Sequence, residues 1–312
     1  MIRGLTTSIV CLCLAIAAAP GGAVGLNSGR GATVIVLSSD AAPYQQAEAG
    51  IRRAREGAGE IRTLRVDGLA AESLKELEKS ADDVVIAIGT PAAVKLHQSL
   101  GQGSRLLYCM VSDPERAGLT AGRRTPGVTV DVPVSEQVAV IKRALPGART
   151  IGVLHRASSD RSRTNLEALR AAWGSEYIIA IDADKHKDVA AALHELIDAK
   201  PDIIWTFADA SVYDSTCTKA LLKESLEAKV PVFGFSLQFV RAGALIGVGV
   251  TPEDQAEQAA RMAADLTGGK DVRAEPTGPR VRLGVNTAIG RRMGVRLPES
   301  FLRAVDETFG EE

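Results

Sequence analysis

Short runs of valine and isoleucine alternate with longer segments of helical pattern over most of the chain. A β-strand that is buried on both faces of a parallel sheet has a continuous apolar run of this kind. The first set of predicted strands covers residues 33–37, 61–66, 84–88 and 106–111, and the helices between them cover about 43–56, 71–79 and 91–100. Strands that alternate with helices predict βαβ units and a parallel sheet.

A second set of strands and helices follows a break at residues 127–132, which we interpret as a strand that connects two lobes. The strands of this set cover residues 150–154, 177–181, 203–207 and 230–233, and its helices cover about 163–173, 188–199 and 214–228. The repeated order predicts an α/β protein of two Rossmann-like lobes, each with a parallel sheet.

The C-terminal portion predicts that the chain crosses back between the lobes. A strand at residues 244–250 precedes a helix that Thr251 caps, with Pro252 at its first position and Asp254 completing a capping box. The last strand, residues 280–286, leads into a helical tail. We expect the first lobe to comprise residues 31–130 plus about 237–270, and the second lobe residues 131–236 plus about 280–312. Several hinge strands between two lobes are typical of a cleft that opens and closes.

The N-terminus has the pattern of a secretory signal. Arg3 precedes an apolar run at residues 9–19, and small residues follow at 20–25. We therefore expect residues 1–25 to be a signal peptide and the protein to be exported. The alternative is a retained membrane anchor, but a run of roughly a dozen apolar residues is short for a span of about 20.

The four cysteines fall into two pairs. Cys11 and Cys13 lie in the signal segment and would be removed with it, whereas Cys109 and Cys217 lie in different halves of the chain. In an exported protein the second pair could form a disulfide, and two buried free thiols are the alternative.

Composition excludes several classes of partner and cofactor. The 312 residues suffice for two domains, and the net charge of -1 comes without a basic stripe, so we expect no binding to nucleic acid. The chain has no P-loop and no dinucleotide-binding glycine motif, and its four histidines are scattered singly. We therefore expect neither a cofactor nor a metal ion.

The candidate site residues of the first lobe follow its predicted strands. Open α/β sheets bind ligands at the carboxyl ends of their strands. Thr90 is predicted to cap a helix that has Pro91 at its first position, which favours a ligand carboxylate there. The other first-lobe candidates are Ser38, Ser39, Gly89, Ser112 and Asp113, with Tyr44 in the next helix as a residue that could close over the ligand. Plain helix capping is the alternative role of the hydroxyls.

The second lobe supplies three candidates of the same kind. Asp209 follows a predicted strand and could bind a ligand ammonium group through a charge-assisted hydrogen bond, with helix capping as the alternative. Ser236 follows the last strand of the second set, and Asn165 lies on the helix after the first. Together the candidates predict a cleft that holds a small amino-acid-like molecule or carboxylate.

The order of these elements and several local segments resemble a known family. The segments are residues 87–93, 111–114, 230–236 and 241–245, spread over nearly the whole chain after the signal. They are similar to the ABC transporter substrate-binding proteins related to the tryptophan-binding protein TrpX. The resemblance implies the type I periplasmic-binding-protein fold and a periplasmic receptor that delivers a small solute to an ABC permease and ATPase. Departures at residues 208–210 and at Ser236 point away from an aromatic amino acid as ligand.

Two other functions remain to be weighed. A periplasmic sensory module would use the same cleft but report to a membrane signalling protein. A hydrolase would need a nucleophile motif, and Gly234-Phe235-Ser236-Leu237-Gln238 has Gln238 where the second glycine belongs. All four histidines precede Ser236, which is the wrong order for such an enzyme. We therefore expect no catalysis.

Overall fold

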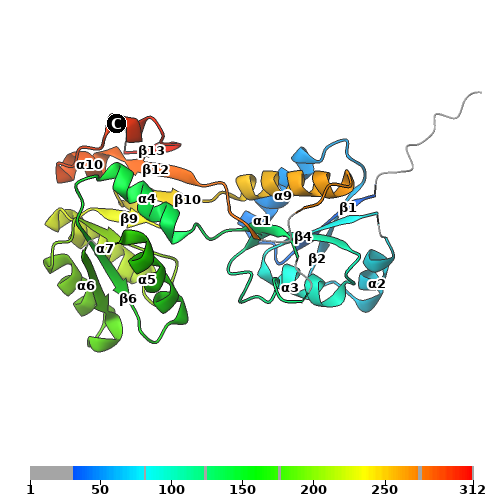
Figure 1. Cartoon of the computed structure of the whole chain (residues 1–312), viewed down its shortest axis with the longest axis horizontal. Helices are drawn as coiled ribbons and strands as arrows, with labels where there is room; N and C mark the ends of the chain where they lie inside the picture. The colour runs from blue at the N-terminus through cyan, green and yellow to red at the C-terminus, as the bar shows by residue number, and fades with distance from the viewer. Residues whose placement is uncertain (1–30, 81, 123–124, 175–176, 273–275, 311–312) are drawn as a thin grey trace, which may run out of the picture.

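The computed structural model describes residues 31–310, except 81, 123–124, 175–176 and 273–275. It consists of two α/β lobes joined by extended segments (Figure 1). The predicted signal peptide, with Cys11 and Cys13, lies outside the described residues. No described helix is both long enough and apolar enough to cross a bilayer.

The first lobe is built on a six-stranded sheet in which every pair of neighbouring strands is parallel. In sheet order its strands are β11 (Pro276–Thr277), β5 (Gly127–Thr129), β4 (Arg105–Val111), β3 (Val84–Ile88), β1 (Thr33–Leu37) and β2 (Ile61–Arg65). Its helices are α1 (Ala42–Ala54), α2 (Ala71–Lys79), α3 (Thr90–Ser99) and α9 (Pro252–Thr267).

Apolar side chains cover both faces of this sheet, as the continuous valine and isoleucine runs predict. All five residues of β1 and of β3 are buried. Alternate residues enter two separate core clusters: Ile35 and Ile86 pack with α1 and α9, whereas Val34 and Val85 pack with α2 and α3. Helices therefore lie on both faces, and the carboxyl ends of the strands stay open for loops.

The second lobe has a seven-stranded sheet. In sheet order its strands are β13 (Glu307–Phe309), β12 (Arg282–Asn286), β10 (Ile246–Gly249), β9 (Val232–Gly234), β8 (Ile203–Trp205), β6 (Thr150–His155) and β7 (Tyr177–Asp182). The sheet is parallel except where β10 pairs with β12. Its helices are α4 (Val134–Ala144), α5 (Asp160–Trp173), α6 (Val189–Asp198), α7 (Ser215–Ala228), α8 (Leu237–Ala242), α10 (Thr287–Met293) and α11 (Glu299–Leu302), with a short 3-10 turn η1 at Ala183–Lys185.

The predicted fold class of two α/β lobes is confirmed. One of the predicted boundaries between the lobes differs in the structure. Residues 237–249 were expected in the first lobe, but β10 pairs with β9 and β12 in the second sheet. Two glycines permit this close pairing, because a Cβ on Gly247 would lie 2.3 Å from the carbonyl oxygen of Gly234. Helices α4 and α8, which the sequence analysis did not predict, also belong to the second lobe.

The described chain passes between the lobes at three places, after β5, after β10 and after β11 (Figure 1). The second passage enters α9 through the predicted capping box: Thr251 Oγ1 accepts a hydrogen bond from the Asp254 backbone N–H at 3.1 Å. Arg282, just after the third passage, donates two hydrogen bonds to the Asp254 carboxylate, at 2.7 and 2.8 Å. This ion pair links the first-lobe helix α9 to the second-lobe strand β12.

Cys109 and Cys217 are both free and both buried, so the alternative of two buried thiols is confirmed and the disulfide is not formed. They lie in core clusters of different lobes. Burial raises the pKa of Cys109 to about 12 and that of Cys217 to about 11. Two such thiols are unreactive at neutral pH and leave the lobes free to move relative to each other.

Candidate functional site

Three neighbouring strands of the first lobe end in candidate site residues at one edge of the sheet. The strands lie in the order β4, β3, β1, and Ser112, Gly89 and Ser38 follow them in turn. The structure therefore brings together the strand ends that the sequence analysis selected.

Gly89 and Ser38 form the centre of this edge. Gly89, and not Thr90, is the N-cap of α3, so Thr90 takes the first helical position. The cap is supplied from the neighbouring strand end, because Ser38 Oγ accepts the Ala92 N–H at 3.0 Å. A Cβ on Gly89 would lie 2.6 Å from Ser38 Oγ and 3.1 Å from Cε1 of Tyr44. Tyr44, which is half-buried, thus borders the same spot as Ser38 and Gly89.

Ser112 and Asp113 are held by Asp131, which lies on the first passage between the lobes. Asp131 Oδ2 accepts the Ser112 hydroxyl at 3.0 Å and the Asp113 backbone N–H at 2.7 Å. Asp113 has a left-handed backbone, with φ of 49°, and its own carboxylate accepts the Arg116 N–H at 3.0 Å. The polar end of β4 is therefore joined to the hinge.

Arg161, in the first turn of α5, reaches from the second lobe to this group. Its Nη2 lies 3.0 Å from Asp131 Oδ1, and its Nη1 donates to Ser112 Oγ at 3.3 Å. Arg116 and Asp160 form a second ion pair between the lobes, at 3.6 Å. The sequence analysis missed Arg161 and Asp131, since only the placement of the two lobes brings residues 30 positions apart into contact.

Replacing Arg161 with alanine should loosen the lobes with little loss of stability. Both side chains of its ion pair are about two-fifths exposed, so we expect the free energy of unfolding to fall by only about 0.5–1 kcal/mol. Spin labels at Lys75→Cys and Lys223→Cys should report a broader distance distribution between the lobes. Arg163→Ala is the matched control, because the bonds of Arg163 to described residues, Ala157 and Asp160, stay within its own lobe. Equal distributions for the two variants would contradict a bridging role for Arg161.

In the second lobe, Asp209 follows β8 and is 8% exposed. Its carboxylate accepts hydrogen bonds from Ser159, Ser162 and Ser211. Burial alone would raise the pKa of Asp209, but the hydrogen bonds from these serines outweigh burial and place the pKa below its usual value. Asp209 is therefore an ionised carboxylate at neutral pH.

The remaining candidates make local hydrogen bonds at or near the same edges. Ser39 Oγ accepts the Ala41 N–H at 3.3 Å, and Ser236 caps α8 by accepting the Phe239 N–H at 3.3 Å. Asn165 donates to the Arg161 carbonyl oxygen, one turn earlier in α5, at 2.9 Å. Helix capping by a serine hydroxyl is thus present at Ser38, for α3, and at Ser236, for α8, whereas α1 has no side-chain cap. Among the described residues, no group of three or more His, Cys, Asp or Glu side chains could hold a metal ion.

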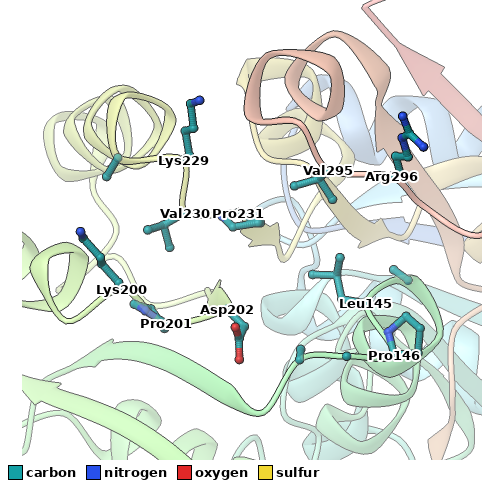
Figure 2. A pocket seen from close by; sticks show the side chains of 14 residues that line it. Leu145, Pro146, Lys200, Pro201, Asp202, Lys229, Val230, Pro231, Val295 and Arg296 are labelled. Atoms are coloured by element: carbon teal, nitrogen blue, oxygen red, sulfur yellow. The ribbon is translucent and has the colours of Figure 1, made fainter.

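A pocket of about 480 Å³ lies at the opposite edge of the second sheet (Figure 2). Its lining includes Ala148, Asp202 and Pro231, which precede β6, β8 and β9 respectively. Asp202 is engaged at the sheet edge, where it accepts the backbone N–H groups of Arg149 and Thr150 at 2.8 Å each. The pocket therefore lies at the amino ends of the strands and contains none of the candidate site residues.

Known proteins resemble this chain over most of its length. A curated relative, a tyrosine-binding protein of Clostridioides difficile (strain R20291), is 24% identical over 197 residues, which are 61% of this chain and 56% of that protein. Among solved structures, the ligand-free, open form of a substrate binding protein with adhesive properties from Clostridium difficile superposes with a TM-score of 0.73 at 20% identity, over 90% of this chain and all of that one. An ABC domain from Streptococcus pneumoniae in complex with L-Trp gives a TM-score of 0.57 at 20% identity, with the same coverage.

The solved structures show that the fold is that of the periplasmic binding proteins, and the first of them is described as a substrate binding protein. The family model described as "ABC transporter substrate binding protein" matches residues 63–309. That match takes in the first lobe from within β2 onward, the second lobe and all three passages between them. The chain therefore belongs to the ABC transporter substrate binding protein family.

Proposed function

We propose that this chain is the exported, periplasmic solute-binding component of an ABC importer, and that it captures one small amino-acid-like molecule or carboxylate by closing its lobes. The observation that supports this most is the pairing of polar strand ends from the two sheets. Ser112 at the end of β4 and Arg161 in α5, the helix that follows β6, are joined by a hydrogen bond between the two lobes. Three passages of chain between the lobes provide the hinge.

The chemistry of the two sheet edges suits an amino-acid-like ligand. In the first lobe the N-terminus of α3 offers the Thr90 hydroxyl and the positive end of the helix dipole for a carboxylate. Tyr44 and Phe235 offer apolar contact on either side, and both are half-buried. A relative called a tyrosine-binding protein and a structure solved with L-Trp support an amino acid as the ligand class. The ligand residues we propose are Ser38, Ser39, Tyr44, Gly89, Thr90, Ser112, Asp113, Asn165 and Ser236, with Asp209 behind them.

The proposal also covers export of the chain and its partners in the membrane. Residues 1–25 would direct the chain to the periplasm and be removed, and the closed, liganded lobes would present a surface to a membrane permease with its ATPase. Members of this family act outside the cytoplasm, which supports such export. A mature N-terminus at Leu26 in the periplasmic fraction would support it directly.

A thermal-shift screen over amino acids and small carboxylates tests the proposed function. A ligand present at 100 times its Kd should stabilise the protein by about 2.7 kcal/mol and raise the Tm accordingly. With the strongest hit, Thr90→Ala and Ser112→Ala should each weaken binding, whereas Thr216→Ala, on an exposed part of α7, should not. A screen with no hit would contradict the proposed function, and unchanged affinity in both site variants would contradict the proposed site.

A further inference from the structure

The carboxylate of Asp209 lies at the centre of a group of three serines, of which Ser159 and Ser162 belong to the start of α5 and Ser211 to the loop after β8. Oδ2 accepts the hydroxyls of Ser159 at 2.7 Å and of Ser162 at 2.8 Å. Oδ1 accepts the hydroxyl of Ser211 at 2.6 Å and its backbone N–H at 3.0 Å. An ionised carboxylate has about four lone-pair positions, so Asp209 has no position left for a ligand.

The direction of these hydrogen bonds determines whether the serine hydroxyls can donate a hydrogen bond to a ligand or only accept one. A carboxylate accepts only, and a serine hydroxyl carries a single proton, so each of the three hydroxyls donates its proton to Asp209. Ser162 is fully buried, and its oxygen also accepts the Arg156 N–H at 3.2 Å. Ser159 is half-buried and Ser211 is exposed. The Ser159 oxygen also accepts the Ser162 backbone N–H at 3.3 Å, which leaves it one lone pair. To a ligand these two oxygens therefore offer lone pairs and no proton.

The two exposed oxygens lie at the edge that faces the first lobe. Ser159 follows β6 and Ser211 follows β8, and these strands are neighbours in the sheet. Ser159 is also the N-cap of α5, the helix whose first turn carries Asp160 and Arg161 to the first lobe. Arg156 joins the two loops, because its Nε donates to the Ser211 carbonyl oxygen at 2.7 Å.

We infer that Asp209 is a positioning residue, which fixes Ser159 and Ser211 as hydrogen-bond acceptors so that this wall of the interlobe site selects ligands with a protonated amine. The inference deepens the proposed function and rests on it. Arg156 pairs with Asp184 at 2.8 Å, and within the described part of the chain the Asp209 carboxylate accepts hydrogen bonds from serines alone. The negative charge of Asp209 therefore acts through the serines, and an ammonium group, with three donors and a positive charge, suits such a wall better than a neutral hydroxyl.

The test compares ligands that differ only in the amine. Each amino acid that stabilises the wild-type protein is paired with its deaminated acid, such as L-tyrosine with 3-(4-hydroxyphenyl)propionate, and D-glucose serves as a hydroxyl-only probe. The wild-type protein should bind the amine-bearing member at least tenfold more tightly. Ser211→Ala and Asp209→Asn should each reduce that preference severalfold while leaving the affinity for the deaminated acid unchanged.

Ser215→Ala is the matched control, since Ser215 is an exposed serine of the same lobe. Ser211→Ala changes an exposed side chain, so we expect this variant to fold normally. Its result therefore tests the inference even if Asp209→Asn disturbs folding. The inference would be overturned, and the proposed function left standing, if the wild-type protein bound both members of a pair equally or if the variants weakened both members equally. Tighter binding of D-glucose would overturn both the inference and the proposed ligand class. The absence of any hit for the wild-type protein would overturn both.

Discussion

Asp254→Ala should lower the free energy of unfolding by about 3 kcal/mol at neutral pH. The Asp254 side chain is 1% exposed, and its carboxylate accepts two hydrogen bonds from Arg282, whose side chain is 31% exposed. Removing one partner of a buried pair leaves the other charge uncompensated, and the partial exposure of Arg282 keeps the loss at the lower end of the usual range. Chemical denaturation monitored by circular dichroism measures the change.

The effect of Asp254 should also depend on pH. Burial by itself would raise the pKa of Asp254, but the hydrogen bonds from Arg282 and Thr251 lower it below its usual value. A carboxylate with a lowered pKa in the folded state stabilises the fold above its ordinary pKa, and this contribution is lost as the pH falls through the folded value. The difference between wild type and Asp254→Ala should thus be constant near neutrality and shrink below about pH 4.

Asp265→Ala is the control for Asp254. Asp265 lies on the same helix and pairs with Lys270 at 2.8 Å, but that pair is exposed. The control should leave the unfolding midpoint nearly unchanged. A loss in Asp254→Ala no larger than in Asp265→Ala would show that the link between α9 and β12 contributes nothing to stability.

Gly89→Ala should cost about 3 kcal/mol of stability and abolish ligand capture. Gly89 has φ of 90° and ψ of 160°, a conformation that is essentially restricted to glycine and costs other residues roughly 1–3 kcal/mol. The added Cβ would also collide with Ser38 Oγ and displace the hydroxyl that caps α3. Losing that cap accounts for about 1 kcal/mol of the expected total. Thermal unfolding and the ligand screen measure the two effects.

Gly57→Ala is the control that separates the cost of backbone strain from the cost of a steric collision of the added Cβ. Gly57 also has a positive φ, of 76°, but a Cβ there would have no neighbour within 4 Å. We expect a loss of about 1 kcal/mol and normal ligand binding. If Gly89→Ala behaves like Gly57→Ala in both measurements, then the contact of Gly89 with Ser38 and Tyr44 is unimportant.

The parts of the fold that could be predicted are those encoded by continuous patterns. The five-residue runs of β1 and β3 are buried on both faces, and the residues after them, Ser38 and Gly89, meet at one sheet edge as expected. The boundary at residues 237–249 was predicted wrongly because β10 is short, and its place depends on pairing with β9 and β12. Nothing within the strand itself encodes which lobe it joins.

The parts of the site that could not be predicted depend on partners distant in sequence. Asp209 could be identified as a charged residue at a strand end, but its saturation by Ser159 and Ser162 arises only when β6 and β8 become neighbours. Likewise, Arg161 and Asp131 meet only because α5 of the second lobe approaches the first passage between the lobes. A sequence pattern identifies the position of a polar residue, whereas the folded chain decides which of its atoms remain available to a ligand.

The distance between the lobes, measured with and without ligand, tests closure around a solute most directly. Spin labels at Lys75→Cys and Lys223→Cys lie on α2 of the first lobe and α7 of the second, and both native side chains are exposed. Saturation with the strongest hit of the thermal-shift screen should replace the distribution of the free protein with a shorter and narrower one. A hit that stabilises the protein while the distance distribution stays unchanged would contradict capture by closure of the two lobes.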